Sequence, residues 1–148
     1  MNATMNPLET SGLELLRAAV AGDFSGSTMA QTIPMTFLEV DVGHVKMSAR
    51  ADHRHLNPLG GVHGGFAATV LDSVTGCAVH STLEAGVGYG TIDLQVKMLR
   101  PVPRNQALMA EATTVHVSRN IATSEGTLKS SDGKLLATAT ATCFLKRG

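Results

Sequence analysis

The segment from Gly64 to Leu83, with the sequence GGFAATVLDSVTGCAVHSTL, limits the possible folds of this chain more than any other. Most of its residues are apolar or small, and Asp72 is its one formally charged side chain. Removing a lone carboxylate from water is costly, so it must be protonated, paired or used in chemistry. Asp72 is therefore the first residue whose role has to be explained.

Three interpretations compete for this segment. About 20 mostly apolar residues can cross a bilayer, but Asp72, His80 and the glycines make the segment too polar for a typical span. A second interpretation is a buried core helix in which Asp72 hydrogen-bonds a neighbouring backbone group. The third is a catalytic helix, because the free N–H groups of Gly64 and Gly65 can stabilise a developing oxyanion and let a substrate carbonyl approach closely.

The two ends of such a catalytic helix cannot meet in one chain. Asp72 follows Gly64 by eight residues, which corresponds to about 12 Å along a helix axis. That separation is too large for both groups to touch one reacting carbon. Two such helices packed antiparallel about a twofold axis would bring Gly64 of one chain near Asp72 of the other, so the sequence predicts an obligate dimer with two equivalent sites.

Composition narrows the class of protein. The 148 residues favour one domain, and 12 basic against 12 acidic side chains give no electrostatic support for binding nucleic acid or an anionic membrane surface. Four phenylalanines, one tyrosine and no tryptophan argue against a base-stacking surface. Cys77 and Cys143 form no CxxC pair, which predicts buried free thiols. The N-terminus does not read as a secretory signal, so we expect a cytoplasmic protein.

Local patterns predict an N-terminal segment, residues 1–30, followed by a single domain, residues 31–148. Ser11 can cap a short helix that continues to about Ala21. Alternating runs predict six strands, two before the long helix and four after it: 36–42, 44–51, 89–99, 107–117, 121–129 and 135–145. In the last run, alanines and Cys143 alternate with threonines, which predicts one apolar face. We therefore expect an α+β fold in which one curved antiparallel sheet wraps around a central helix.

Two stretches of the sequence are similar to a known family. HLNPLGGVHGGFAATVLDSVTGCA and the later GTIDLQVKMLRPV resemble the hotdog-fold acyl-CoA thioesterases of the PaaI and 4-hydroxybenzoyl-CoA type. The resemblance implies the hotdog fold and hydrolysis of an acyl-CoA thioester without a metal or an organic cofactor. It also implies self-association as a homodimer or, as a pair of dimers, a homotetramer.

The resemblance assigns roles to matching positions. It implies that Asn57 and the N–H of Gly64 polarise the thioester carbonyl. Asp72 of the facing subunit then acts either as a general base on water or as a nucleophile. Thr91 lies where relatives carry a hydroxyl that helps to hold water, and an ordinary strand threonine is the alternative. We expect His63 to hold the loop and the helix start through hydrogen bonds, with a catalytic base as the alternative.

One branch of the family differs at two positions. It carries Glu at the position of Asp72 and a hydroxyl one helical turn later, where Gly76 stands here. The combination of Asp72 and Asn57 is closer to the PaaI-like branch, so the aromatic-acid specificity of the Glu branch is not carried over. Three arginines near strand ends are candidate ligands for the phosphates of CoA, with solvated surface positions as the alternative: Arg100, Arg104 and Arg119.

Two other functions and a metal site are the alternatives to thioester hydrolysis without a metal. A non-catalytic acyl-CoA-binding module would need an output domain, for which residues 1–30 leave little room. A dehydratase or hydratase would need a histidine where Asn57 stands. His53, His55 and His63 could form part of a metal site, but no further ligand completes the coordination shell at a useful spacing, so we expect no metal.

Overall fold

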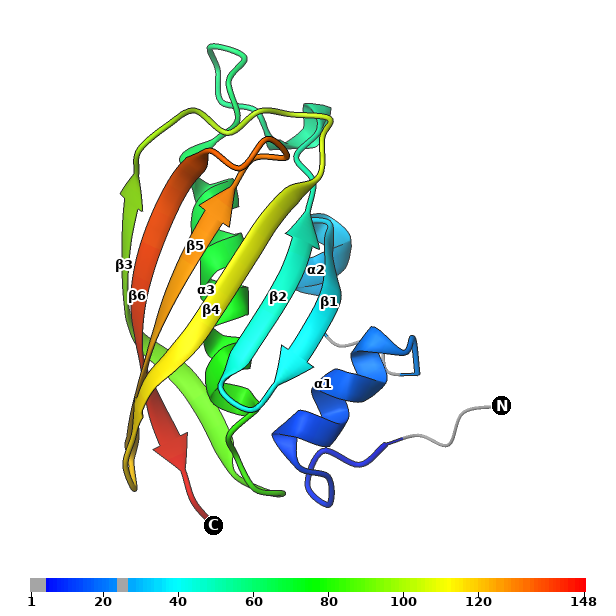
Figure 1. The fold of residues 1–148 in the computed structure, drawn as a ribbon, viewed down its shortest axis with the longest axis vertical. Coiled ribbons are helices and arrows are strands. Elements are labelled where there is room, and N and C mark those ends of the chain that lie inside the picture. The colour runs from blue at the N-terminus through cyan, green and yellow to red at the C-terminus, as the bar shows by residue number, and fades with distance from the viewer. Residues whose placement is uncertain (1–4, 24–26) are drawn as a thin grey trace.

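The computed structural model describes residues 5–23 and 27–148, and a six-stranded antiparallel sheet curves around one long helix (Figure 1). The long helix α3 (Gly64–His80) follows β2 in the chain, and two shorter helices, α1 (Gly12–Val20) and α2 (Met29–Thr32), precede β1. The predicted architecture is confirmed. The strands are β1 (Met35–Asp41), β2 (His44–Ala49), β3 (Gly88–Met98), β4 (Leu108–Val117), β5 (Ile121–Lys129) and β6 (Leu135–Lys146).

The predicted strand boundaries agree with the structure to within two residues. The predicted cap of α1 is also confirmed, because the side chain of Ser11 accepts a hydrogen bond from the N–H of Glu14. Helix α3 ends at His80, where the hydroxyls of Ser81 and Thr82 bond to the last-turn carbonyls of Ala78 and Val79. Helix α2 and a 3-10 turn at His53–His55 were not predicted, since both are too short for periodicity to show.

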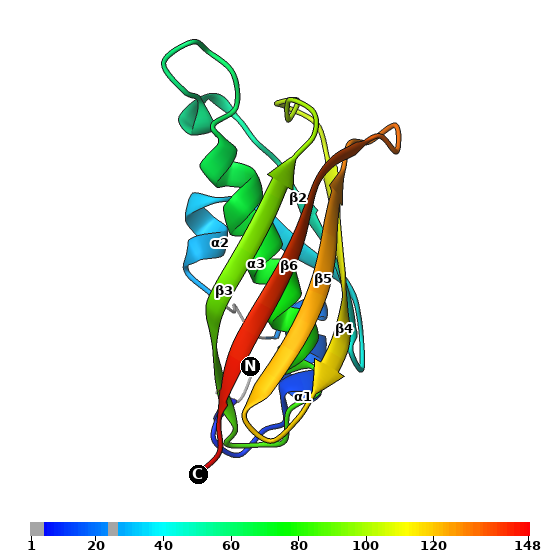
Figure 2. The ribbon, with the colours of Figure 1, turned by 90° about the vertical axis from the view of Figure 1, so that its left-hand side faces the viewer.

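The sheet has the strand order β1-β2-β4-β5-β6-β3, so β1 and β3 form its two edges. Figure 2 shows α3 lying against one face of the sheet. Within the residues that the structure describes, no helix is long and apolar enough to cross a membrane. The membrane-span interpretation of the Gly64–Leu83 segment is therefore wrong, and the segment forms the central helix.

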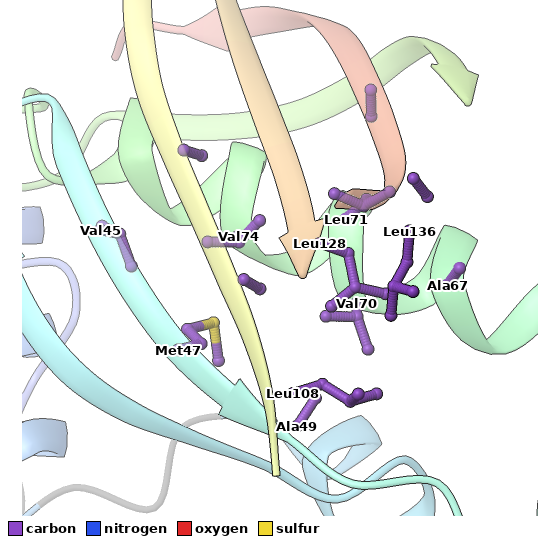
Figure 3. Packing of buried hydrophobic residues seen from close by; sticks show 14 of the residues in the cluster. Val45, Met47, Ala49, Ala67, Val70, Leu71, Val74, Leu108, Leu128 and Leu136 are labelled. Atoms are coloured by element: carbon purple, nitrogen blue, oxygen red, sulfur yellow. The ribbon is translucent and has the colours of Figure 1, made fainter. Parts of the chain in front are cut away.

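The core lies between α3 and the inner face of the sheet (Figure 3). Val70, Leu71 and Val74 on the helix are fully buried against sheet residues such as Leu108 and Leu128. Burying each side chain of this size contributes about 1.5–3 kcal/mol. The inner face of β6 consists of small side chains, as its alternation predicts: Ala137, Ala139, Ala141 and Cys143.

Small residues let the sheet approach the helix closely. A Cβ at Gly126 of β5 would lie 2.9 Å from Cγ2 of Thr75, too close for a real contact. Thr75 itself is fully buried and donates its hydroxyl to the carbonyl of Leu71 over 2.6 Å. This short distance between helix and sheet fixes which side chains of β3 can reach α3.

A bulge in β3 sets the direction of its side chains. Thr91 pairs with Cys143 and Asp93 pairs with Thr142, so Ile92 is an extra residue between them. Thr91 pairs with an inward residue of β6, and Leu94, beyond the bulge, also pairs with an inward residue, Ala141. In a regular strand, residues 91 and 94 would lie on opposite faces. The bulge therefore turns Thr91 toward the helix without exposing the apolar residues that follow.

The N-terminal helix packs against the domain. Helix α1 contacts β1, and the N–H of Gly12 donates to the carbonyl of Leu83 over 3.1 Å. A Cβ at Gly12 would lie 1.8 Å from the carbonyl oxygen of His80, so only glycine fits there. Residues 12–20 are thereby held against the C-terminal end of α3.

Candidate active site

Asp72 lies half-buried on the side of α3 that faces β3. The hydroxyl of Thr91 donates to Oδ1 of Asp72 over 2.9 Å. This contact supplies the hydrogen-bond partner that a carboxylate in an apolar helix requires. The second carboxylate oxygen has no partner among the described residues and is available to a water molecule or a substrate.

The N-terminus of α3 is capped by His63. The ring atom Nδ1 of His63 accepts a hydrogen bond from the backbone N–H of Gly65 over 2.8 Å. The backbone N–H of His63 donates to the carbonyl of His55. These bonds hold the start of the helix, as expected of His63, and a role as catalytic base stays the alternative. The expectation that both glycine N–H groups are free is wrong, because the ring of His63 occupies that of Gly65. Within the described residues, the N–H of Gly64 has no acceptor.

Asn57 stands in the turn that leads to α3, and its Oδ1 accepts from the N–H groups of Leu59 and Gly61 over 2.9 and 3.2 Å. The backbone N–H of Asn57 donates to the carbonyl of Gly61 over 2.7 Å. These bonds fix the orientation of the amide, and Nδ2 is left without an acceptor among the described residues. Asn57 therefore stabilises its own turn and also presents one free donor.

A cavity of about 510 Å³ opens beside Asp72. It lies between α3 and β3 on one side and the N-terminal helices and β1 on the other. Its wall includes Thr91 near Asp72 and apolar side chains from the other side, among them Leu16, Phe37 and Met47. An apolar cavity with a carboxylate on its wall can hold a hydrophobic group while its polar end reacts.

Three titratable side chains on this wall remain uncharged near neutral pH. Burial raises the pKa of Cys77 to about 12, with a smaller effect from the charge of Asp72, so its thiol is a poor nucleophile. Burial also raises the pKa of Tyr89 and lowers that of His80. Asp72 is the one carboxyl side chain among the described residues that line the cavity. Tyr89 was not identified as a site residue from the sequence, because nothing near it in the chain indicates its contact with α3.

The candidate arginines lie at two ends of the molecule. Arg100 lines a second cavity of about 310 Å³ that also contains Gly64, and its Nη1 donates to the carbonyl of Leu135. Arg104 precedes β4, whereas Arg119 follows it. A strand of this length spans roughly 30 Å, so Arg119 cannot share a phosphate with Arg100 or Arg104 in one chain.

Two of the histidines considered as metal ligands, His55 and His63, form hydrogen bonds with the backbone instead. Nδ1 of His55 accepts from the N–H of Asp52, and its Nε2 contacts the carbonyl of Thr32 over 3.0 Å. His63 caps α3 with Nδ1. Over residues 5–23 and 27–148, no group of three or more His, Cys, Asp or Glu side chains is placed to hold a metal ion.

Known proteins share this arrangement of sheet and helix. Residues 59–137 match the model of the thioesterase superfamily, which is more than half of the chain. The chain belongs to the thioesterase superfamily. This assignment confirms the family predicted from the sequence, and with it thioester hydrolysis as the class of activity.

Three relatives illustrate the extent of the similarity. A Caenorhabditis elegans protein named as an esterase is 31% identical over 135 residues, which cover 88% of this chain and 79% of that protein. Human acyl-coenzyme A thioesterase 13 is 25% identical over 104 residues, 70% of this chain and 74% of its own. The crystal structure of a phenylacetic acid degradation-related protein from Ralstonia eutropha has a TM-score of 0.79 and 35% identity, over 88% of this chain and 98% of that one.

Proposed function

We propose that this thioesterase hydrolyses an acyl-CoA to a free acid and CoA at two equivalent sites, each shared between two copies of the chain. The observation that carries the proposal is the placement of Asp72 and Gly64 on one continuous helix. Asp72 lies on a cavity wall, and the free N–H of Gly64 lies eight residues earlier at the helix start. About 12 Å of helix separates the two groups, so a second copy must supply one of them.

The exposed edge of β3 supports pairing with a second copy. Strand β3 pairs only with β6 among the described strands, and its side chains Ile92 and Met98 are 63% and 55% exposed. A long edge strand with apolar side chains is a template for pairing with another strand. We therefore infer that the β3 strands of two copies pair antiparallel and extend the sheet across the dimer.

The position of β3 over α3 supports the same dimer. Thr91 contacts Asp72, and the side chain of Met98 lies against Gly64, where a Cβ would be 2.9 Å from Sδ. Strand β3 and helix α3 thus run in opposite directions. Asp72 lies under the Thr91 end of the stretch 91–98, and Gly64 lies under its Met98 end. Antiparallel pairing of two β3 strands about the middle of this stretch would align Asp72 of one copy with Gly64 of the other.

The chemistry follows from the groups that this dimer assembles. The N–H of Gly64 and Nδ2 of Asn57 donate to the thioester oxygen and stabilise its developing negative charge. Asp72 takes a proton from water while the water oxygen forms a bond to the carbonyl carbon. The carbon–sulfur bond then breaks, and the CoA thiolate leaves and is protonated. In the alternative course, Asp72 attacks the carbon itself, and water hydrolyses the resulting mixed anhydride.

Two observations support CoA as the leaving group: the position of Arg100 and the name of one relative. Arg100 lies beside Gly64 at the helix start, where its guanidinium can meet a phosphate of CoA. The name of human acyl-coenzyme A thioesterase 13 gives the same substrate class for that relative. We propose a cytoplasmic enzyme that requires neither a metal nor an organic cofactor, since Asp72 and two hydrogen-bond donors suffice for the steps above.

A panel of short, medium, long and aryl acyl-CoA thioesters tests the proposal, with release of free CoA followed by a thiol reagent. We expect turnover of at least one member that depends on Asp72, with the Asp72→Asn variant as the matched control. Tight binding of acyl-CoA without turnover would instead support a non-catalytic acyl-CoA-binding module. Turnover that persists in the variant would show that another group performs the chemistry.

A further inference from the structure

The cavity beside Asp72 continues along α3. Asp72, Gly76 and His80 follow one another at intervals of four residues, so they lie on one face of the helix, and all three line the cavity. The distance from Asp72 to His80 is about 12 Å along the axis. A group whose reacting end lies at Asp72 can therefore extend over Gly76 toward His80.

Tyr89 lies over the middle of this path. A Cβ at Gly76 would be 3.2 Å from Cε2 of Tyr89 and 3.7 Å from its hydroxyl oxygen. The ring also packs against the ring of His80, with a centroid distance of 4.9 Å. The missing side chain of Gly76 thus makes room for the tyrosine. Gly76 lies about 6 Å beyond Asp72 along the helix axis, so the hydroxyl of Tyr89 lies over the next turn of α3.

The hydroxyl of Tyr89 forms no hydrogen bond within the described residues, and Tyr89 lines the cavity. Burial, with smaller effects from Cys77, Cys143 and Asp72, raises its pKa, so the phenol keeps its proton at neutral pH. A neutral phenol can donate one hydrogen bond and accept others. A polar group directed into an apolar cavity without a partner is a typical specificity element of a ligand site.

The opposite wall of the cavity is mainly apolar and comes largely from α1, α2 and β1. Leu16 of α1 and Met35 and Phe37 of β1 line this wall. The close contact of Gly12 with His80 holds α1 against the end of α3. A chain bound along α3 therefore meets apolar side chains opposite Gly76, where the hydroxyl of Tyr89 is the polar group nearest to the helix.

We propose that Tyr89 is a specificity-determining residue that selects acyl groups bearing a hydrogen-bonding oxygen about 6 Å from the thioester carbonyl. This inference rests on the proposed function, because it places the thioester at Asp72. The acyl chain packs against the apolar wall, and its oxygen accepts the hydrogen bond of the Tyr89 hydroxyl. An all-carbon chain of the same shape leaves that hydroxyl without a partner, which a water-excluding cavity penalises.

The test compares two acyl-CoA thioesters of equal shape. In 5-oxohexanoyl-CoA a carbonyl oxygen stands where 5-methylhexanoyl-CoA has a methyl group. We expect the wild-type enzyme to prefer the oxo substrate by about tenfold in kcat/KM, the value of one hydrogen bond. In Tyr89→Phe, which keeps the ring over Gly76, we expect the ratio between the two substrates to fall close to one.

A control variant and a binding measurement separate the possible outcomes. Phe37→Leu alters the apolar wall and should change the rates of both substrates alike. Calorimetry with the Asp72→Asn variant, alone and combined with Tyr89→Phe, measures the same preference without turnover. Equal losses on both substrates in Tyr89→Phe, or no preference in the wild type, would overturn the role of Tyr89. A binding preference without hydrolysis of either thioester would uphold it and contradict the proposed function.

Discussion

The hydroxyl of Thr91 donates a 2.9 Å hydrogen bond to Oδ1 of Asp72, from a strand that begins after the helix has ended. This bond is possible because the bulge at Ile92 directs Thr91 toward α3. It restrains the carboxylate of a residue that lines the cavity.

Replacement of Thr91 by valine should therefore lower kcat/KM about tenfold, since one hydrogen bond to the carboxylate is lost while the shape is kept. Thr91→Ser retains the hydroxyl and should keep most of the activity. Steady-state kinetics together with thermal melting test this. If valine and serine variants have the same activity, the hydroxyl has no part in the reaction.

Asp72→Asn should abolish turnover and leave the fold intact. The amide has the same shape and can still interact with Thr91, but it can neither remove a proton from water nor form an anhydride. The measurement is kcat on the best acyl-CoA of the panel, with circular dichroism as the control for folding. A variant with near wild-type kcat would assign Asp72 a structural role.

Asn57 has two roles that two variants can separate. Its Oδ1 holds the turn through Leu59 and Gly61, whereas its free Nδ2 is the proposed donor to the thioester oxygen. We expect Asn57→Ala to lower kcat/KM roughly 10²-fold and also to lower Tm. Asn57→Asp keeps an oxygen acceptor for the turn and should preserve Tm better while losing the same activity. Full activity in the Asp variant would exclude the donor role.

His80 should make the fold less stable in acid. Burial lowers the pKa of His80 below its ordinary value of 6.5. Below that pH the unfolded chain binds a proton that the folded chain does not, so stability falls as pH falls. His80→Gln removes this effect. The free energy of unfolding of this variant, relative to that of the wild type, should therefore rise as the pH falls from about 7.5 to about 5. Urea unfolding at fixed protein concentration measures it, and a relative stability independent of pH would contradict it.

The sequence was sufficient to predict the six strands and the helices α1 and α3. The period-two runs and the apolar Gly64–Leu83 segment produced strands and a helix close to those observed, because burial on one face imposes a regular spacing. Asp72 was identified from its isolation among apolar residues. The predicted cap at His63 also followed from local sequence, since capping depends on neighbours in the chain.

Other features depend on contacts between distant segments, which periodicity cannot show. The bulge at Ile92 breaks the alternation of β3, so a regular reading of the strand places Thr91 and Leu94 on opposite faces. The packing of Tyr89 over Gly76 joins a strand to a helix. Neither position carries a local signal of the other, and only the assembled fold shows the pair.

The shared site is tested most directly by mixing two inactive variants. Asn57→Ala and Asp72→Ala subunits, refolded together, should form heterodimers in which one of the two sites is complete. Random pairing makes half of the dimers heterodimers, so we expect about a quarter of the wild-type kcat per subunit, far above either variant alone. Native mass spectrometry verifies subunit exchange. An absence of recovery in a sample with demonstrated heterodimers would contradict a site built from Asp72 of one copy and Asn57 and Gly64 of the other.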